Sequence, residues 1–225
     1  YIGLMSGTSL DGVDGVLVDI ADTGVVKALA HAHHSFEAAI RTELMALNSA
    51  SGDELHRTAL AANAVARAYA AVVTDVLRRS GNTADHITAL GAHGQTVRHR
   101  PREFDGTGYT VQLLNAALLA ELSGIDVVAD FRSRDVAAGG QGAPLAPGFH
   151  AAVFAKAGEE RGLLNLGGIA NLTRLGADGS VLGFDTGPAN ALLDGWCERH
   201  LGRAFDANGD WAAGGRIIEP LLAQW

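Results

Sequence analysis

The chain has 225 residues, of which 48% are hydrophobic and 19% charged, and this composition favours a folded core over disorder. A formal net charge of −8 argues against nucleic acid as a partner, because phosphate binding needs a basic face. The longest apolar runs are shorter than the roughly 20 residues of a membrane helix, and no basic and apolar leader opens the chain. One cysteine, Cys197, excludes an internal disulfide. We therefore expect a soluble cytoplasmic protein without a membrane partner.

The first element is the most informative. Residues 2–5 and 13–20 are apolar runs on either side of a turn rich in Gly, Ser and Thr, which predicts strand, turn, strand. Glycines with φ > 0 would let the main chain approach an anion, and Asp11 is placed to hold a hydrated divalent cation beside it. An ordinary hairpin is the alternative. The turn has neither the lysine and helix of a P-loop nor G-x-G-x-x-G, so a phosphate role indicates the actin-like ATPase design, with a cleft between two α/β domains.

Strands and helices then alternate, which favours an α/β fold. Helical spacing of apolar residues predicts a long helix at 53–79, ended by Gly81 and Asn82. The other expected elements are strands at 25–33, 87–90, 109–113 and 125–129 and helices at 41–47 and 115–122. A charged run after residue 129, followed by a glycine-rich segment, predicts a domain boundary that leaves 1–133 as the first domain and 134–225 as the start of the second. In the second, we expect strands on either side of a glycine turn within 163–173, a strand at 181–184 and a helix at 190–199.

Several polar residues follow these strands. Asp185 comes at the carboxyl end of a predicted strand, where it would act as a general base or simply cap the next helix. His93 would bind a polar ligand or be a satisfied core residue, and Arg132 and Arg134 would clamp an anion or form an interdomain salt-bridge cluster. Ser9 lacks the G-x-S-x-G context of a hydrolase nucleophile. No histidine pattern with a nearby acid marks a zinc site.

Six blocks of the sequence resemble the anhydro-N-acetylmuramic acid kinases, a family of the actin–hexokinase–Hsp70 superfamily. They are G-L-M-S-G-T-S-L-D-G at 3–12, G-Q-T at 94–96, D-V-V-A-D-F-R at 126–132, A-A-G-G-Q-G-A-P-L at 137–145, N-L-G-G-I-A-N at 165–171 and G-F-D-T-G-P at 183–188. The blocks occur in order and run nearly from end to end of the chain. The resemblance implies the two-domain, ribonuclease H-like fold with a central cleft, and a second domain that is incomplete here.

The resemblance also implies an activity. Such kinases use ATP and water to open the 1,6-anhydro ring of 1,6-anhydro-N-acetylmuramic acid and to phosphorylate O6, which gives N-acetylmuramic acid 6-phosphate and ADP in peptidoglycan recycling. By the family pattern, Asp185 is the base that activates water and also contacts the sugar. The other sugar contacts are His93, Thr96 and Arg132. Phosphate binding falls to Gly7, Thr8, Ser9, Leu10, Asp11, Gly12 and Gly168, with Asp11 holding Mg²⁺ through water. A homodimer is a family expectation.

The chain also departs from the family pattern. Leu114 and Ala189 stand where glycine is usual. Leu114 would crowd the sugar pocket or shift the strand end, whereas Ala189 is a milder change if its φ is negative. Family members continue well past Trp225, so we expect an incomplete adenosine site. Two other classes remain open: a non-catalytic sugar-binding protein of the same fold, and a chaperone-like or assembly ATPase.

Overall fold

The computed structural model describes residues 1–224, and its internal contacts divide the chain into two units, Tyr1–Ala155 and Lys156–Trp225. The expected boundary after residue 133 falls within the first unit, in the short helix α4 (Ser133–Ala137). The assignment of 1–133 and 134–225 as domains therefore stays a prediction.

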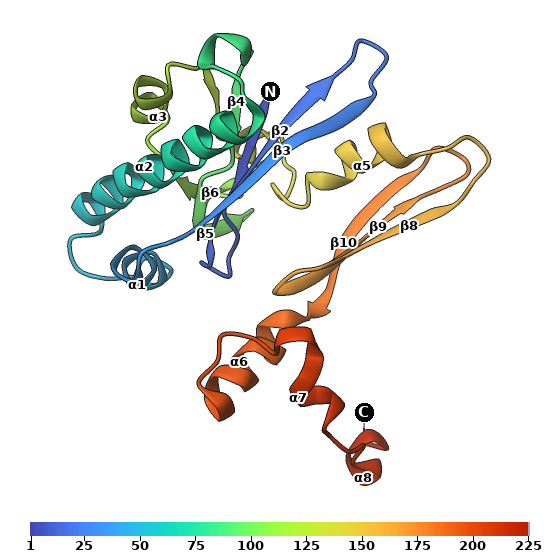
Figure 1. Ribbon diagram of the computed structural model, residues 1–225. Coiled ribbons are helices and arrows are strands. Elements are labelled where there is room, and N and C mark those ends of the chain that lie inside the picture. Colours follow the sequence, from blue (N-terminus) through green and yellow to red (C-terminus); the bar gives the residue numbers. More distant parts are fainter. Residues whose placement is uncertain (225) are drawn as a thin grey trace. The chain divides into compact units, whose positions relative to one another are not determined.

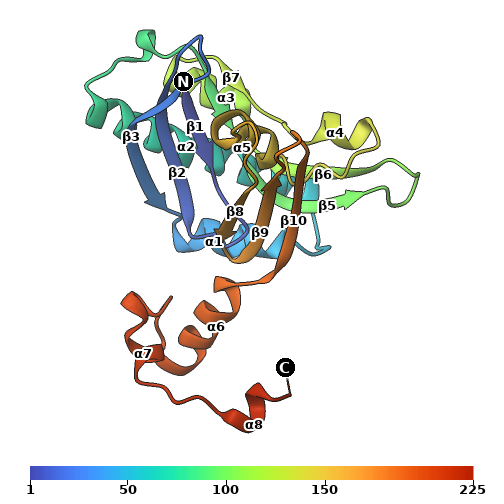
Figure 2. The ribbon, with the colours of Figure 1, turned by 90° about the vertical axis from the view of Figure 1, so that its right-hand side faces the viewer.

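A five-stranded mixed sheet forms the centre of the first unit, in the order β3-β2-β1-β4-β7. Strand β1 (Ile2–Met5) pairs antiparallel with β2 (Gly12–Ile20) and parallel with β4 (Leu90–Ala92). Strand β3 (Val26–Ser35) continues the meander, and β7 (Val127–Val128) runs parallel to β4. Figure 2 shows β1, β2 and β3 side by side. The predicted strand–turn–strand at the start of the chain is confirmed.

One long helix, α2 (Glu54–Ser80), packs against β2 and β3 and provides most of the helical side of the core (Figure 1). Its buried face consists of Ala61, Val65, Ala66, Tyr69, Val72, Val73 and Val76. It ends as the sequence predicts, at Gly81, whose φ of 68° lets its N–H bond the Leu77 carbonyl. Among the described residues, α2 alone has the length and composition of a membrane span. The buried face of α2 belongs to the hydrophobic core of the first unit, as in the core helix of a globular domain.

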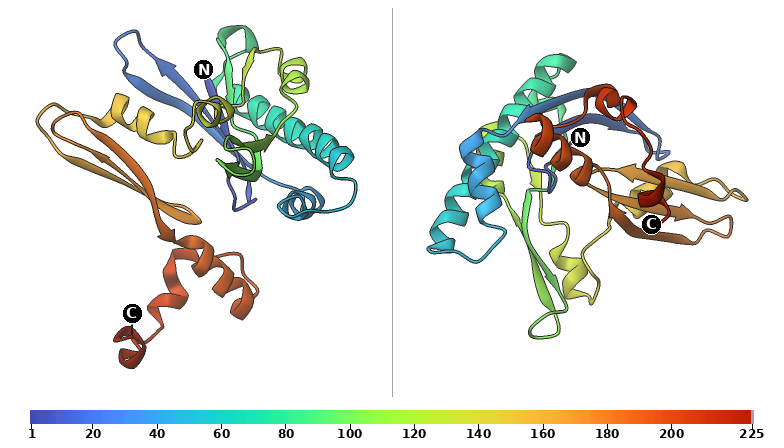
Figure 3. Two further views of the ribbon diagram at one scale, coloured as in Figure 1. Left: turned by 180° about the vertical axis from the view of Figure 1, so that it is seen from behind. Right: turned by 90° about the horizontal axis from the view of Figure 1, so that it is seen from below.

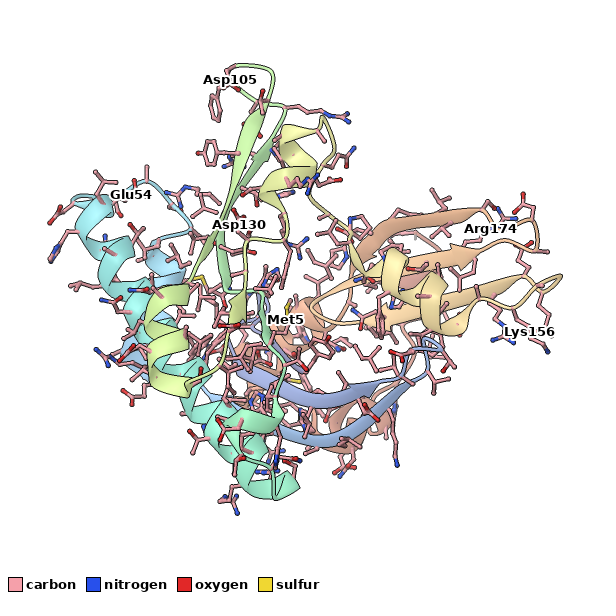
Figure 4. All side chains as sticks on the ribbon, turned by 90° about the horizontal axis from the view of Figure 1, so that it is seen from above. Met5, Glu54, Asp105, Asp130, Lys156 and Arg174 are labelled. Atoms are coloured by element: carbon pink, nitrogen blue, oxygen red, sulfur yellow. The ribbon has the colours of Figure 1, made fainter. Side chains whose placement is uncertain are left out.

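Shorter elements complete the first unit. Helix α1 (Ala38–Ala46) contacts α2, and a 3₁₀ turn (Ala84–His86) precedes β4. A separate hairpin consists of β5 (Gln95–Pro101) and β6 (Gly108–Leu113), and Asp105 at its tip accepts bonds from the Thr107 and Gly108 N–H groups (Figure 4). Helix α3 (Ala116–Ser123) is capped by the Asn115 side chain and ends at Gly124, as predicted. Helix α5 (Ala146–Phe154) and strand β5 are elements that the sequence pattern did not predict.

The second unit is a three-stranded antiparallel meander followed by short helices (Figure 3). Strands β8 (Arg161–Leu166), β9 (Ile169–Leu175) and β10 (Val181–Pro188) lie in the order β10-β9-β8. Helix α6 (Asn190–Leu201) follows, then a 3₁₀ turn (Ala207–Gly209), α7 (Asp210–Ala213) and α8 (Glu219–Leu222). The strand predicted to stop at 184 is longer, because β10 keeps pairing with β9 as far as Pro188. The expectation that Asp185 follows the strand end was therefore wrong.

Candidate functional site

The turn between β1 and β2 has its left-handed residue at Leu10, not at a glycine. Leu10 has φ 56°, whereas Gly7 and Gly12 are absent from the residues of positive φ, so the expectation that glycines supply φ > 0 here was wrong. The side chain of Leu10 is 1% exposed and belongs to the core. Burying a leucine contributes about 1.5–3 kcal/mol, which offsets the roughly 1–2 kcal/mol cost of the left-handed backbone. The turn is thus anchored in the core by its own sequence.

The acid of the turn is held by its neighbours. Asp11 is exposed, and its Oδ1 accepts a bond from the Ser9 hydroxyl at 2.7 Å and from the Gly12 N–H at 3.1 Å. Gly12 is needed because a Cβ there would lie 2.2 Å from the carbonyl oxygen of His34 on β3. Within the described chain, the backbone N–H groups of Thr8 and Ser9 donate to no other group. Free N–H groups beside a fixed carboxylate suit a phosphate with a hydrated cation.

Gln95 is hydrogen-bonded to the backbone of this turn. Its side chain is fully buried, and its amide nitrogen donates to the Gly7 carbonyl at 3.0 Å, the same oxygen that accepts the Leu10 N–H. Its Oε1 has no hydrogen-bond partner among the described residues. Sequence reasoning quoted Gln95 in a family block but assigned it no role. The sequence signal that could have found it is a polar side chain directly after Gly94, within the block at 94–96.

Thr8 of the turn and Thr96 of β5 line the same open cavity of about 240 Å³. Asn48 and the residues from Val97 to Arg100 complete its wall. Thr96 Oγ1 accepts a bond from the Gln112 amide at 3.3 Å, while Arg98 is tied to Glu54 and to the Leu47 carbonyl. The structure therefore brings together one residue predicted for phosphate and one predicted for sugar. Sequence reasoning missed the other lining residues because it did not predict β5.

His93 and Arg132 lie in direct contact. Arg132 Nε donates to His93 Nε2 at 3.0 Å, and Arg132 Nη1 donates to the Gly142 carbonyl at 2.7 Å. Burial, and to a smaller extent the Arg132 charge, lowers the pKa of His93 below its usual value. Burial also lowers the pKa of Arg132, although a guanidinium stays charged. Both ring nitrogens of His93 have partners in the described chain, and its binding of a polar ligand stays a prediction.

The glycine-rich segment after α4 folds around one carboxylate. Asp135 accepts the Gly142 N–H at 2.7 Å, and a Cβ at Gly140 would overlap the same carboxylate. Gly142 has φ 69° and is enclosed by Val136 and Arg132. Among the described residues, neither Arg132 nor Arg134 forms a salt bridge. An interdomain salt bridge from either arginine, the alternative to an anion clamp, therefore stays a prediction.

Asp185 and Gly168 belong to the second unit. Asp185 is exposed, pairs with Asn171 of β9 and precedes a bulge at Gly187, whose φ is 139°. Helix α6 has its N-cap at Ala189 with no side-chain cap, so Asp185 does not cap it. The Gly168 carbonyl accepts the N–H groups of Ala189 and Ala191, which ties the glycine turn to the start of α6. Asp185 thus projects from a strand that the helix start holds in place.

The two departures from the family pattern have different surroundings. Leu114 is partly buried and packs on the hydrophobic core, next to Gly94. Ala189 has φ −127°, so replacing glycine there introduces no left-handed strain, as expected.

One histidine cluster escaped the sequence analysis. Asp14 pairs with His33 across β2 and β3, and its Oδ1 contacts His31 Nε2 at 3.0 Å and His33 Nδ1 at 3.2 Å. An H-x-H on a strand opposite an acid was the signal for this contact, which the sequence analysis did not use. Even so, no group of three ligands suited to a metal ion occurs in residues 1–224.

Comparison with known proteins gives one consistent family. The family model for anhydro-N-acetylmuramic acid kinase matches residues 1–225. A protein of that name from Variovorax paradoxus is 60% identical over 229 residues, which are 100% of this chain and 61% of the relative. Proteins of the same name from Albidiferax ferrireducens and Bordetella petrii are 56% and 61% identical to this chain, which covers 62% and 57% of their lengths. The chain thus spans about three fifths of these relatives. It belongs to the anhydro-N-acetylmuramic acid kinase family.

Proposed function

We propose that the full-length protein is an ATP-dependent kinase that opens the anhydro ring of 1,6-anhydro-N-acetylmuramic acid and phosphorylates O6. The observation that carries this proposal is the shared cavity, because the turn predicted for phosphate and the strand predicted for sugar meet there through Thr8 and Thr96. A kinase needs these two substrates side by side, since phosphoryl transfer depends mainly on positioning and charge stabilisation.

The turn fits a nucleotide phosphate and Mg²⁺. Its donors are the Thr8 and Ser9 N–H groups and the Thr8 hydroxyl, since the Ser9 hydroxyl already donates to Asp11. Its one carboxylate, Asp11, is an oxygen ligand of the kind that Mg²⁺ prefers. With one carboxylate and no group of three ligands in the described chain, the ion would keep most of its waters. When bound, Mg²⁺ would neutralise charge on the phosphates. Gly168, in the second unit, would contribute to nucleotide binding by backbone contact.

Sugar binding would rest on Thr96 and Arg132 in the first unit. Arg132 keeps donors that no carboxylate of residues 1–224 occupies, and the muramic acid sugar carries a carboxylate. His93 would take part through Arg132. Asp185 would accept a proton from the water that attacks the anomeric carbon while the released O6 receives the γ-phosphoryl group. An exposed carboxylate without a hydrogen-bond partner in the described chain is free for that task.

The remaining proposals concern the whole protein. We infer the two-domain actin-like fold for the full-length chain, a cytoplasmic location where ATP is available, and a possible homodimer. The mixed sheet with its antiparallel β1–β2 turn supports that fold. No observation favours the non-catalytic binder or the assembly ATPase, so neither is carried further.

The decisive experiment measures ADP release by the full-length protein with and without the anhydro sugar. We expect release that depends on the sugar; ADP release at the same rate without sugar would contradict the proposal. Asp185→Asn should lower kcat by about 10²–10⁴ because it removes a general base, while calorimetry should still detect sugar binding. Asp194→Asn, on α6 of the same unit, is the matched control. Retention of most activity by Asp185→Asn would refute the assignment of the base.

A further inference from the structure

The two partners of His93 fix its protonation state. His93 Nδ1 lies 2.6 Å from the Gly94 carbonyl oxygen, and a carbonyl accepts but never donates, so Nδ1 carries a hydrogen. His93 Nε2 lies 3.0 Å from Arg132 Nε, and a guanidinium donates but never accepts, so Nε2 bears a lone pair. Only the neutral imidazole with hydrogen on Nδ1 satisfies both contacts.

The Gly94 carbonyl connects this imidazole to the core. It also accepts a bond from the Ser6 hydroxyl at 3.2 Å, and that hydroxyl lies 2.9 Å from the hydroxyl of Tyr69 on α2. Ser6 and Tyr69 are 2% and 0% exposed. Gly94 has φ 76°, and a Cβ there would lie 2.9 Å from the Leu113 carbonyl, so the backbone at this point is tightly enclosed. The carbonyl that accepts the His93 Nδ1–H is therefore itself fixed by buried residues.

Arg132 is held by neutral acceptors alone. Its two contacts are His93 Nε2 and the Gly142 carbonyl, and Nη2 donates to no group of residues 1–224. The charged and titratable groups near this pair are Asp135, which bonds the Gly142 N–H, His99, which lies close to Gly142, and Tyr69, reached through Ser6. None of them pairs with Arg132. The guanidinium is thus oriented without being neutralised, and its Nη2 hydrogens stay free for an anion.

We propose that His93 is a positioning residue, which in its neutral form holds Arg132 for the carboxylate of the sugar without touching the substrate itself. This inference rests on the proposed function for its substrate. Protonation of Nε2 would replace an acceptor with a donor facing the guanidinium, and the contact would be lost. Of the contacts seen in residues 1–224, the bond to the Gly142 carbonyl alone would then orient Arg132.

The direction of the pH effect follows from the surroundings of His93. Burial and the Arg132 charge place the pKa of His93 below its usual 6.5. The neutral form therefore predominates at neutral pH, and the contact with Arg132 is lost only as the pH falls below that value. Sugar affinity should be flat above neutral pH and should decline on the acid side.

The experiment uses the full-length protein and compares His93→Gln, His93→Ala, Arg132→Ala and the double alanine variant. A glutamine supplies a neutral acceptor for Arg132 and a donor for Gly94 at every pH, so His93→Gln should stay within about threefold of the wild-type KM for sugar at neutral pH. His93→Ala should raise that KM about tenfold or more, with a smaller change in kcat, because it removes a bond to a charged group. His56→Gln, an exposed site on α2, is the matched control.

Two kinetic outcomes decide the proposal. Between about pH 5 and pH 8, kcat/KM for sugar should fall on the acid side in the wild type relative to His93→Gln. A ratio that does not change with pH would overturn the inference. His93→Ala should add little to the loss caused by Arg132→Ala, because the histidine acts through the arginine. A further tenfold loss in the double variant would mean that His93 contacts the substrate independently.

A spectroscopic readout separates this inference from the proposed function. Nitrogen NMR of the histidine rings in the full-length protein should report the hydrogen of His93 on Nδ1 at neutral pH, and the Arg132 Nε–H resonance should shift in His93→Ala. The opposite tautomer would overturn the positioning role. If the wild type released no ADP in response to sugar, the proposed function would fail, and this readout would still decide whether His93 holds Arg132.

Discussion

The two units differ in how completely they bury their apolar residues. The first has a continuous core that includes Ile2, Leu10, Tyr69 and Leu90, each at most 1% exposed. In the second, the buried residues are Ala170, Thr173, Leu175 and Cys197, while large apolar side chains remain uncovered. Among these are Leu164, Leu166, Ile169, Leu182, Leu192, Leu193 and Trp196, all at least half exposed.

This difference shows which part of the chain carries its own stability. Burial contributes about 25 cal/mol per Å² of apolar surface, so a three-stranded meander with its apolar side chains in water gains little. The relatives are longer, since this chain covers 57–62% of three of them. We infer that the second unit depends on further chain for its core, whereas the turn, Gln95 and the His93–Arg132 pair belong to a unit that already has one.

Core truncation in the first unit should have the largest effect. Leu90 is fully buried on β4, and Leu90→Ala should lower the free energy of unfolding by about 2–5 kcal/mol, because it leaves a cavity between the sheet and its neighbours. Denaturant titration followed by circular dichroism measures this change. A loss below about 1 kcal/mol would contradict the assignment of a close-packed core to this unit.

The next effect concerns the close approach of β2 and β3. Gly12→Ala would place a Cβ 2.2 Å from the His34 carbonyl, and the resulting backbone shift should cost about 1–3 kcal/mol and displace Asp11. Gly3→Ala is the matched control, because a Cβ at Gly3 meets nothing within 4 Å. Equal stability of the two variants in the same denaturant titration would show that the strands are not so close.

A smaller effect is expected from the buried tyrosine. Burial raises the pKa of Tyr69 to about 12, so the folded state keeps its proton in a range where the unfolded chain loses it. Stability should therefore fall as the pH rises from about 10 to 12, by on the order of 2 kcal/mol, and Tyr69→Phe should remove that part of the decline. Identical pH profiles for the two proteins, measured by thermal unfolding, would place the Tyr69 hydroxyl in water.

The smallest effect should come from the second unit. Leu192 is 66% exposed on α6, so Leu192→Gln should change the stability of this chain by less than about 0.5 kcal/mol. In the full-length protein the same variant should cost more than about 1 kcal/mol, provided that further chain covers α6. An equal loss of stability in this chain and in the full-length protein would contradict the inference that further chain covers the second unit.

Much of the first unit could be predicted from sequence, because its signals are local. The periodicity of α2, the Gly81 end and the Asn115 cap each follow from neighbouring residues. Strand β5 was missed because Arg98 and Arg100 interrupt its apolar pattern, and the partners of Arg98, Glu54 and the Leu47 carbonyl, are distant in sequence. Helix α5 was missed because Pro147 and Gly148 resemble a loop.

The site shows the same limit. The turn and the predicted sugar contacts were assigned from motifs, but motifs did not reveal that Leu10 carries the positive φ or that His93 faces Arg132. The conformation of Leu10 and the orientation of His93 both depend on residues that are distant in sequence and close in the fold. The second unit was read correctly as strands, yet its poor burial could not be foreseen, since exposure depends on residues that pack against it from elsewhere.

The Gln95 amide bound to the Gly7 carbonyl has a consequence for ligand affinity. A free loop that closes on a phosphate must lose conformational entropy when the ligand arrives. Here the turn is tied to β5 at one end and to the core through Leu10, so most of that entropy is lost when the protein folds. The stability of the first unit would in this way hold the turn in place for the phosphate that we propose it binds.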